Sequence, residues 1–398
     1  MYKLYGDGIH DDTNAIQELL DSKISLVELP APKKHYCISR TLKIYSGQTF
    51  RLGETTVIKL LPNSNCQMIT NGDRPSHDIS IVGGIWDYDN VNQAPNPIIA
   101  PDYHDKYPSH FDGNPNTVKR YGDEYRGSIM RFYQVERFSI HDLTLKNPVT
   151  YCLEMAYIRY FTVENIRFDQ NLGNPTAQNM DGIHVDGGCR FGSIRNVQGT
   201  CYDDIVALNA DDGCDGPIED IEVDGVFGLN SLRGVRLLSI KSEMNRISIN
   251  NVFGTFYQNC IVLAYFYTRS GVHGKMNNIS ISNIFAENDV RIPECKKTGP
   301  YFFSLIWLDG DIDYGNINIS KVYRDEKIGN VETIHVCENA KIDTLALSHV
   351  YQKNYTGEPI TLFKNDGEID RLVLNDICAY GDKEFENNGT IKNIIKCN

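Results

Sequence analysis

The sequence ISINNVFG at residues 247–254 recurs as ISISNIFA at residues 279–286 and as INISKVYR at residues 317–324. Each copy has two aliphatic residues that alternate with polar ones, then a polar position, and then a third aliphatic residue. A similar pattern occurs in FSIHDLTL, FTVENIRF, GSIRNVQG, IEVDGVFG, LALSHVYQ and LVLNDICA. Apolar residues that alternate with a period of two, rich in Val and Ile and separated by turn residues, predict β-strands.

The last aliphatic residue of each copy measures the length of the repeat. These residues are Leu143, Ile166, Val197, Val226, Val252, Ile284, Val322, Val350 and Ile377. Successive copies are therefore 23 to 38 residues apart. Strand repeats of this length are typical of a solenoid, because one coil is too small to bury its own apolar face. The sequence predicts an all-β fold, a right-handed single-stranded parallel β-helix that forms a single domain over residues 1–398.

An open end of such a solenoid would expose strand edges and apolar side chains to water. The segment DDTNAIQELLDSK, residues 11–23, predicts an N-terminal capping helix. Asp12 or Thr13 can serve as its N-cap, and Ile16, Leu19 and Leu20 form an apolar stripe.

Two segments interrupt the repeat. Residues 87–126 lack alternation and contain many Tyr, Pro, Asp and Asn residues, and residues 287–300 form a shorter insertion. Long loops on a regular scaffold are often functional. We therefore expect residues 87–126 to flank a cleft.

Composition and charge exclude several classes of protein. The 398 residues are 41% hydrophobic and 23% charged, which is typical of a folded protein. No apolar run approaches the roughly 20 residues of a membrane-spanning helix. A net charge of -13 argues against nucleic acid and anionic membranes as partners. The N-terminal residues MYKLYGDGIHDD lack the apolar stretch of a secretory signal, which favours a cytoplasmic protein or a secreted one whose signal has been removed.

The 11 cysteines show neither CxxC pairs nor the Cys/His spacing of a zinc site. We expect most of them to be buried free thiols, and we expect neither a metal site nor a cofactor. The oligomeric state cannot be inferred from the sequence.

Three aspartates stand at the heads of two consecutive strand-like segments. Asp181 lies in NMDGIH (residues 179–184), and Asp203 and Asp204 lie in CYDDIVALN (residues 201–209). Equivalent residues of consecutive coils stack about 4.8 Å apart, so the three carboxylates are expected to converge. Like charges at that distance raise one pKa, which leaves a protonated acid beside carboxylate bases, as glycoside hydrolysis requires.

Aspartates at strand ends also form turns and stacked ladders, which is the structural alternative. We expect this structural role for Asp211 and Asp212, at the far end of the second segment.

Several further segments carry a resemblance to a known family. GDGIHDDTNAIQELL, YCISRTLKI and GQTFRLGETTVIKLL resemble the N-terminal segments of pectate-lyase-like β-helices and of the polygalacturonases, glycoside hydrolase family 28. In RGSIMRFYQVERFSIHDLTLKNPVTYCLEM, the residues Asn147, Pro148 and Tyr151 stand at an Asn-Ser-Pro-x-Trp turn of that family. NMDGIH stands where the family has Asn-Thr-Asp-Gly, and YDDIVALN stands where it has Gly-Asp-Asp. The resemblance covers roughly residues 5 to 285.

This resemblance implies a glycoside hydrolase in which Asp203 is the general acid. Asp181 and Asp204 would orient and deprotonate water, with inversion at the anomeric carbon. A carboxylate separation of about 5 Å is otherwise typical of retention, so the two arguments differ on stereochemistry.

The sequence departs from the family where the substrate would be recognised. NSLRGVRLLS has no counterpart of the family's Gly-His-Gly, and NCIVLAYFYTR lacks its Arg-x-Lys. Hydrolysis of an oligo- or polysaccharide is therefore a firmer expectation than polygalacturonate, and a neutral sugar or another uronic acid is a real alternative. The candidate substrate-binding residues are Asn179, His184, Tyr202, Arg233, Arg236, Arg269 and His273. Tyrosines of the long insertion, which could stack on sugars or pack within the loop, are Tyr103, Tyr107, Tyr121 and Tyr125.

Three hypotheses follow from the sequence. The first is a glycoside hydrolase, which would act on chain ends if residues 87–126 close one end of the cleft. The second is a polysaccharide lyase or epimerase that uses Ca²⁺ held by the carboxylates and an arginine base such as Arg236. The third is a non-catalytic carbohydrate-binding β-helix, similar to a tailspike.

Overall fold

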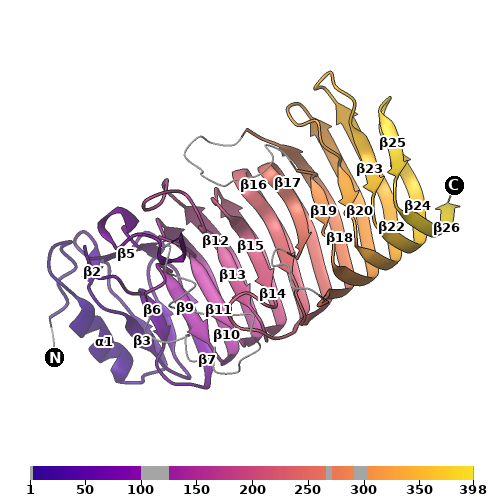
Figure 1. The fold of residues 1–398 in the computed structure, drawn as a ribbon. Helices are drawn as coiled ribbons and strands as arrows, with labels where there is room; N and C mark the ends of the chain where they lie inside the picture. The colour runs from indigo at the N-terminus through magenta and orange to yellow at the C-terminus, as the bar shows by residue number, and fades with distance from the viewer. Residues whose placement is uncertain (1–2, 100–124, 266–270, 291–302, 398) are drawn as a thin grey trace.

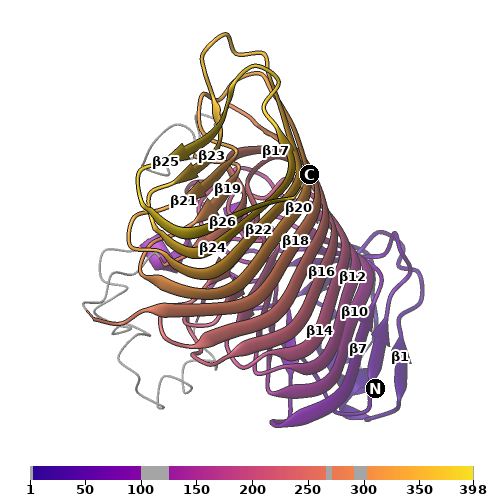
Figure 2. The same ribbon diagram turned by 90° about the vertical axis from the view of Figure 1, so that its right-hand side faces the viewer.

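A computed structural model describes residues 3–99, 125–265, 271–290 and 303–397 of the chain. The fold is a right-handed parallel β-helix with one short helix, α1 (Thr13–Asp21), at the N-terminal end. Its coils follow one another along a single long axis, from α1 to the last strand, β26 (Thr390–Cys397) (Figures 1 and 2). The predicted fold class and the predicted capping helix are both confirmed.

Parallel pairing joins each strand to its counterpart one coil later. The longest sheet, here called the long sheet, contains β1 (Leu26–Glu28), β4 (Thr49–Arg51), β7 (Ser76–Val82), β10 (Val135–Lys146), β12 (Arg159–Asp169), β14 (Arg190–Gly199), the first halves of β16 (Ile218–Leu238) and β17 (Glu243–Ala264), β18 (Gly274–Asn288), β20 (Ile312–Glu326), β22 (Lys341–Asn354), β24 (Glu368–Cys378) and β26.

A second sheet, here called the site sheet, covers another side of the solenoid. It contains β3 (Leu42–Ile44), β6 (Ile69–Asn71), β9 (Met130–Tyr133), β11 (Leu153–Ala156), β13 (Ile183–Asp186), β15 (Asp204–Asn209), the second halves of β16 and β17, β19 (Ile306–Leu308), β21 (Ile334–Val336), β23 (Thr361–Asn365) and β25 (Lys383–Asn387).

A third, short set of strands belongs to the N-terminal coils. It contains β2 (Tyr36–Ile38), β5 (Val57–Leu60) and β8 (Ile85–Asp87), and β8 pairs with the end of β10. Two short 3₁₀ helices follow, η1 (Asn90–Asn92) and η2 (Pro97–Ile99). Residues 100–124 of the predicted insertion and residues 291–300 of the shorter one lie outside the described residues.

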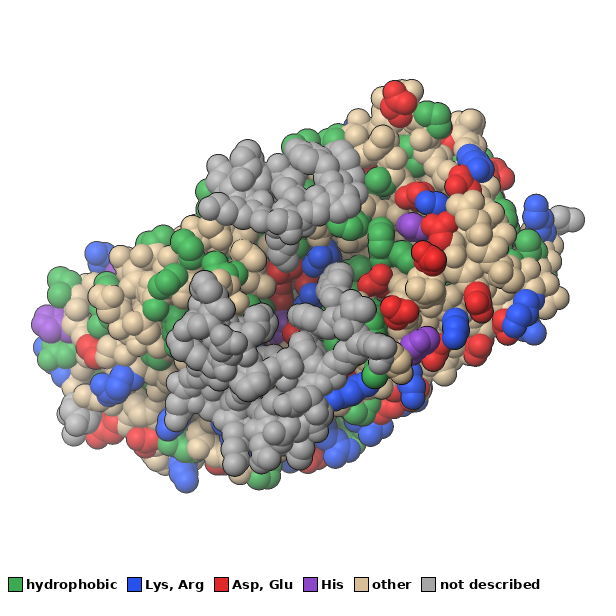
Figure 3. All heavy atoms as spheres, in the orientation of Figure 1, with side chains coloured by type: hydrophobic (Ala, Val, Ile, Leu, Met, Phe, Trp, Pro, Cys, Tyr) green, Lys and Arg blue, Asp and Glu red, His purple; other side chains and the backbone are tan. Residues whose placement is uncertain are grey.

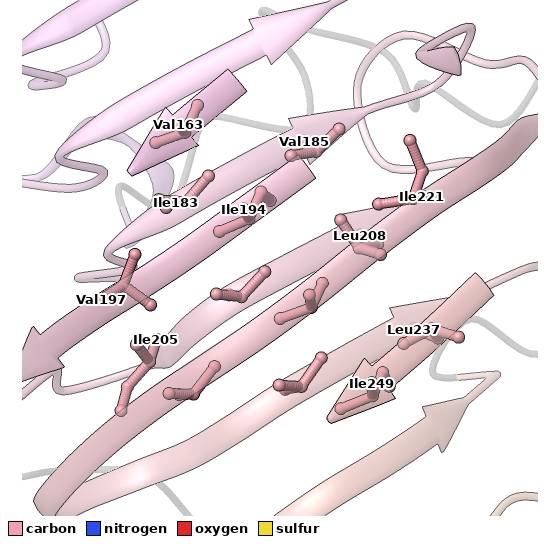
Figure 4. Packing of buried hydrophobic residues seen from close by; sticks show 14 of the residues in the cluster. Val163, Ile183, Val185, Ile194, Val197, Ile205, Leu208, Ile221, Leu237 and Ile249 are labelled. Atoms are coloured by element: carbon pink, nitrogen blue, oxygen red, sulfur yellow. The ribbon is translucent and has the colours of Figure 1, made fainter. Parts of the chain in front are cut away.

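The repeat inferred from the sequence matches the observed register residue for residue. All nine aliphatic residues that measured the repeat are paired in order from Leu143↔Ile166 to Val350↔Ile377. A second interior row runs three residues earlier in each coil and includes Val163, Ile194 and Ile249, which are fully buried (Figure 4). Stacking places each aliphatic side chain against its equivalents in the neighbouring coils, which makes the interior continuous.

The residue before each repeat-defining aliphatic residue lies inside a strand of the long sheet and has a left-handed backbone conformation. Its φ is positive in all nine copies, between 50° and 78°. These residues are Asp142, Asn165, Asn196, Gly225, Asn251, Asn283, Lys321, His349 and Asp376. Gly, Asn and Asp tolerate this left-handed conformation best, which explains their prevalence in the polar pair. The amides also form a ladder, in which Asn165 Nδ2 donates to Asp142 Oδ1 at 2.8 Å and Asn196 Nδ2 donates to Asn165 Oδ1 at 2.7 Å.

The capping helix packs as its apolar stripe predicts, because Ile16 and Leu20 are fully buried. The N-cap falls on one of the two expected residues, without a side-chain cap. Asp12 occupies the N-cap position, but its carboxylate does not bond to the helix and instead accepts the backbone N–H groups of Tyr5, Gly6 and Cys37. Asp12 therefore holds the N-terminal segment against the first coil.

Candidate active site

The three aspartates predicted as catalytic lie together on the site sheet. Asp181 precedes β13 and Asp204 begins β15, and the pairing Ile183↔Val206 places these two residues at the same height in neighbouring coils. One oxygen from each of Asp181, Asp203 and Asp204 lies within 4.8 Å of the other two. Their exposed fractions are 1%, 4% and 0%, respectively. Acidic and basic side chains lie close together in the middle of the face shown in Figure 3.

Two arginines from the next coil meet these carboxylates. Arg233 lies opposite Asp204 in the β15–β16 pairing, and its Nη1 is 3.2 Å from an oxygen of both Asp203 and Asp204. Arg236 Nε is 3.1 Å from the other oxygen of Asp204, and its Nη2 is 3.5 Å from Asp212. The carboxylates are spaced closely enough to hold a cation, and in the described chain the two guanidinium groups supply that positive charge.

His184 lies between two buried carboxylates, those of Asp181 and Asp186. Its Nδ1 is 2.6 Å from Asp181 Oδ2, and its Nε2 is 3.3 Å from Asp186 Oδ1. The ring of Tyr151 stacks on it, with centroids 4.0 Å apart and an interplanar angle of 22°. His184 is 1% exposed, and Asn209 Nδ2 also lies 3.3 Å from its Nε2. Its expected role in substrate binding stays a prediction.

A further buried network lies one and two coils before His184. Glu154 pairs with His184 across the β11–β13 register, and Arg131 pairs with Glu154 across the β9–β11 register. Glu154 receives Arg131 Nε at 2.9 Å, Arg126 Nη2 at 3.4 Å and the Ser128 hydroxyl at 2.9 Å. Sequence reasoning missed these residues, although Glu154 could have been found as the polar residue of LEMA in register with IHVD.

Burial and opposed charges shift several pKa values in this cluster. Burial and the neighbouring Asp203 carboxylate raise the pKa of Asp181 to about 6, although the hydrogen bond with His184 acts in the opposite direction. Burial likewise raises the pKa of Asp186 to about 6. Burial opposes the charge of His184, but its bonds to Asp181 and Asp186 outweigh burial and raise the pKa of His184 well above its usual value. Burial also opposes ionisation of Glu154, but Arg131 and Arg126 outweigh it and lower the pKa of that carboxyl.

The remaining candidate binding residues are more dispersed. Asn179 is half-buried, and its Oδ1 accepts a hydrogen bond from Asn96 at 3.3 Å. Tyr202 is also half-buried, directly before Asp203. His273 Nδ1 contacts Asp313 at 3.2 Å, beside the first residues of β18 and β20 in the long sheet, rather than the carboxylate cluster. Arg269 lies outside the described residues.

Asp211 and Asp212 have different roles, although both were predicted to be turn residues. Asp211 Oδ2 accepts the N–H groups of residues 240, 241 and 242 at 2.8 to 2.9 Å, as a turn residue does. Asp212 instead points to Arg236 and to Asn209 Nδ2, which is 3.4 Å from its Oδ2. Asp212 therefore shares Arg236 with Asp204 and lies beside the three predicted catalytic aspartates.

The predicted cleft tyrosines fall mostly on residues that are not described. Tyr103, Tyr107 and Tyr121 lie in residues 100–124. Tyr125 is described, and it packs against the hydrophobic core while its hydroxyl donates to the Ala94 carbonyl oxygen. For this residue, packing within the protein replaces the suggested stacking on a sugar.

Comparisons with known proteins support the fold. No protein-family model matches the sequence, and no curated protein matches it. Solved structures do match: the surface adhesin PfbA of Streptococcus pneumoniae aligns with a TM-score of 0.60 and 16% identity, over 99% of this chain and 92% of that one. A family 28 exopolygalacturonase of Yersinia enterocolitica aligns with a TM-score of 0.51 and 13% identity, over 97% of this chain and 76% of that one.

At these identities the comparisons show a shared parallel β-helix fold, which serves both an adhesin and a glycoside hydrolase. Function must therefore be argued from the site itself. Within the described residues, no helix is long and apolar enough to cross a bilayer.

Proposed function

We propose that this protein is a glycoside hydrolase that uses Asp181, Asp203 and Asp204 to cleave a glycosidic bond in an oligo- or polysaccharide. The observation that carries this proposal is the convergence of the three carboxylates within 4.8 Å, at the start of two stacked strands. Paired carboxyl groups in different protonation states are the groups that hydrolyse glycosides.

The order of events follows from the chemistry of the three groups. Asp203, the most exposed of them at 4%, donates a proton to the glycosidic oxygen as the bond from that oxygen to the anomeric carbon breaks. A water molecule forms the new bond to the anomeric carbon and gives a proton to Asp181, with Asp204 orienting it. A base with a pKa of about 6, as burial gives Asp181, is ionised near neutral pH and still accepts a proton efficiently.

The stereochemical outcome in this proposal is inversion, through a single displacement by water. The nearest carboxylate oxygens lie closer than the separation of about 6.5 to 9.5 Å that is usual for inverting enzymes. Proton NMR of the first sugar released tests this point, because retention would show that one carboxylate attacks the anomeric carbon itself.

The charges around the site favour a neutral glycan over a polyuronate. Arg126, Arg131, Arg233 and Arg236 each contact a carboxylate of the protein. A uronate group would have to compete with those ion pairs, in a protein of net charge -13.

A glycan panel tests the activity, with neutral polysaccharides and polygalacturonate as substrates and mass spectrometry of the products. The natural protein should release products that carry one added water. Asp203→Asn should fold and lose nearly all turnover. Asp220→Asn is the matched control, because Asp220 pairs with Arg246 on the outer surface of the long sheet.

Retained activity in Asp203→Asn would refute the catalytic assignment. An unsaturated product that absorbs in the ultraviolet and disappears with a chelator would identify a lyase instead.

The second candidate is glycan binding without cleavage. The similarity to an adhesin and the direct pairing of Asp203 and Asp204 with arginines both favour it. In that case a glycan from the panel would bind without forming product, and Asp203→Asn would leave its affinity unchanged.

A further inference from the structure

His184 occupies an unusual position between two acids. Both of its ring nitrogens face a carboxylate oxygen, at 2.6 Å for Asp181 and 3.3 Å for Asp186. A neutral imidazole carries one N–H and can donate to only one of these carboxylates, whereas an imidazolium donates to both. Asp186 Oδ1 makes an ion pair with Nε2 rather than a hydrogen bond, and Asn209 Nδ2 also lies 3.3 Å from Nε2. The two flanking carboxylates favour the cation electrostatically.

The groups packed against His184 also favour a positive charge. Tyr151 presents its ring face at 4.0 Å, and an aromatic face attracts a cation. Glu154 lies opposite His184 in the preceding coil and is itself held by Arg131 and Arg126. In the following coil the charged residues near His184 are Asp203, Asp204 and Asp212. Arg233 and Arg236, from the coil after that one, pair with these carboxylates.

Asp186 has no evident part in the proposed reaction. It is 1% exposed, it ends β13, and among the described residues its ion-pair partner is His184. A buried carboxylate with one cationic partner is costly unless that partner stays charged.

Both oxygens of Asp181 are fixed by the same arrangement. Its Oδ2 faces His184 Nδ1, and its Oδ1 accepts the backbone N–H of Asp204 at 3.1 Å. Two fixed donors define the direction of the remaining lone pairs, which would face the attacking water.

We propose that Asp186 holds His184 as a cation and that His184 is a positioning residue, which keeps Asp181 ionised and aimed at the attacking water. This inference rests on the proposed hydrolase function for its catalytic consequence. The charge state of His184 is independent of that function, so the two can fail separately.

The first test reads the histidine directly, by two-bond ¹H–¹⁵N NMR spectra of the full chain over a pH series. His184 is assigned as the signal lost in His184→Gln. We expect both of its nitrogens to be protonated near neutral pH. Asp186→Asn should lower the midpoint of its titration by about 1 to 3 pH units, the effect of losing one close opposite charge.

The matched control is Asp366→Asn. Asp366 Oδ2 lies 2.7 Å from His335 Nε2 on the same sheet, so this variant also removes one carboxylate from a histidine–aspartate pair. It should leave the His184 signal unchanged. A neutral His184 ring near neutral pH, or a midpoint unmoved by Asp186→Asn, would overturn the inference whether or not any glycan is cleaved.

The second test measures the pH dependence of catalysis. His184→Gln keeps an N–H donor for Asp181 but removes the charge. We expect the acid limb of the kcat/KM profile to move to higher pH by about 1 to 3 units, because Asp181 would lose its cationic neighbour. His335→Gln should leave the limb in place. An equal loss of activity at every pH would show a merely structural role for His184. If His184→Gln fails to fold, Asp186→Asn provides the test instead, because it should move the acid limb to higher pH by a smaller amount.

Discussion

Arg233→Met removes a buried cation from between two carboxylates while keeping a side chain of similar length. Arg233 is 9% exposed in its side chain, and its Nη1 lies 3.2 Å from both Asp203 and Asp204, whose side chains are 6% and 0% exposed. Removing one partner of a buried ion pair costs about 3 to 5 kcal/mol, because the other charge stays buried without compensation. We expect a loss of that size in the free energy of unfolding near neutral pH.

The loss of folding stability in Arg233→Met should become smaller as the pH falls. Without Arg233, the negative charge of this cluster stays buried with one cation fewer, so binding of protons to the cluster stabilises the folded variant more than the natural protein. Its stability relative to the natural protein therefore rises as the pH falls and the carboxylates become neutral. The penalty should shrink between about pH 7.5 and about pH 4.5.

Urea unfolding followed by far-ultraviolet circular dichroism at both pH values measures the effect. Arg195→Met is the control, because Arg195 and Glu222 are 50% and 44% exposed in their side chains and such surface pairs contribute less than about 1 kcal/mol. A cost for Arg233→Met as small as that of the control, or one that does not shrink in acid, would refute the reasoning.

Three further predictions test the scaffold and the base. Asn165→Ala should lower stability by about 1 to 2 kcal/mol, because Ala disfavours the positive φ of 55°, and Asn165→Gly should show no such backbone penalty in the same urea assay. Ile249→Ala should cost about 2 to 5 kcal/mol through a cavity in the buried interior, whereas Ile328→Ala, at a side chain 41% exposed, should cost much less. The kcat/KM of the natural protein should rise with pH through about 6, because Asp181 acts as a base only when it has lost its proton; a flat profile there would contradict its role.

The coil architecture could be predicted because its causes repeat along the chain. Alternating Val and Ile residues need a two-sided strand environment, and a residue that tolerates positive φ must precede the third aliphatic residue of each repeat. These signals are local and occur in every coil, so the sequence alone placed all nine repeat-defining residues in register. The same stacking of consecutive coils predicted that Asp181, Asp203 and Asp204 would converge.

The chemical surroundings of those aspartates depended on the tertiary structure. Coils of 23 to 38 residues give no fixed spacing between side chains that face the same point, so the pairing of Arg233 with Asp203 and Asp204 cannot be read from the sequence. Asp12 illustrates the limit at the N-terminus, since its carboxylate bonds to residues from another segment instead of to its own helix.

The sequence by itself determined a β-helix with three converging carboxylates, because strand period and repeat length are properties of the chain. Only the tertiary structure placed His184 between Asp181 and Asp186 and Glu154 between its two arginines. Those contacts arise between side chains of stacked coils, where burial strengthens each charge interaction and so decides which groups hold protons.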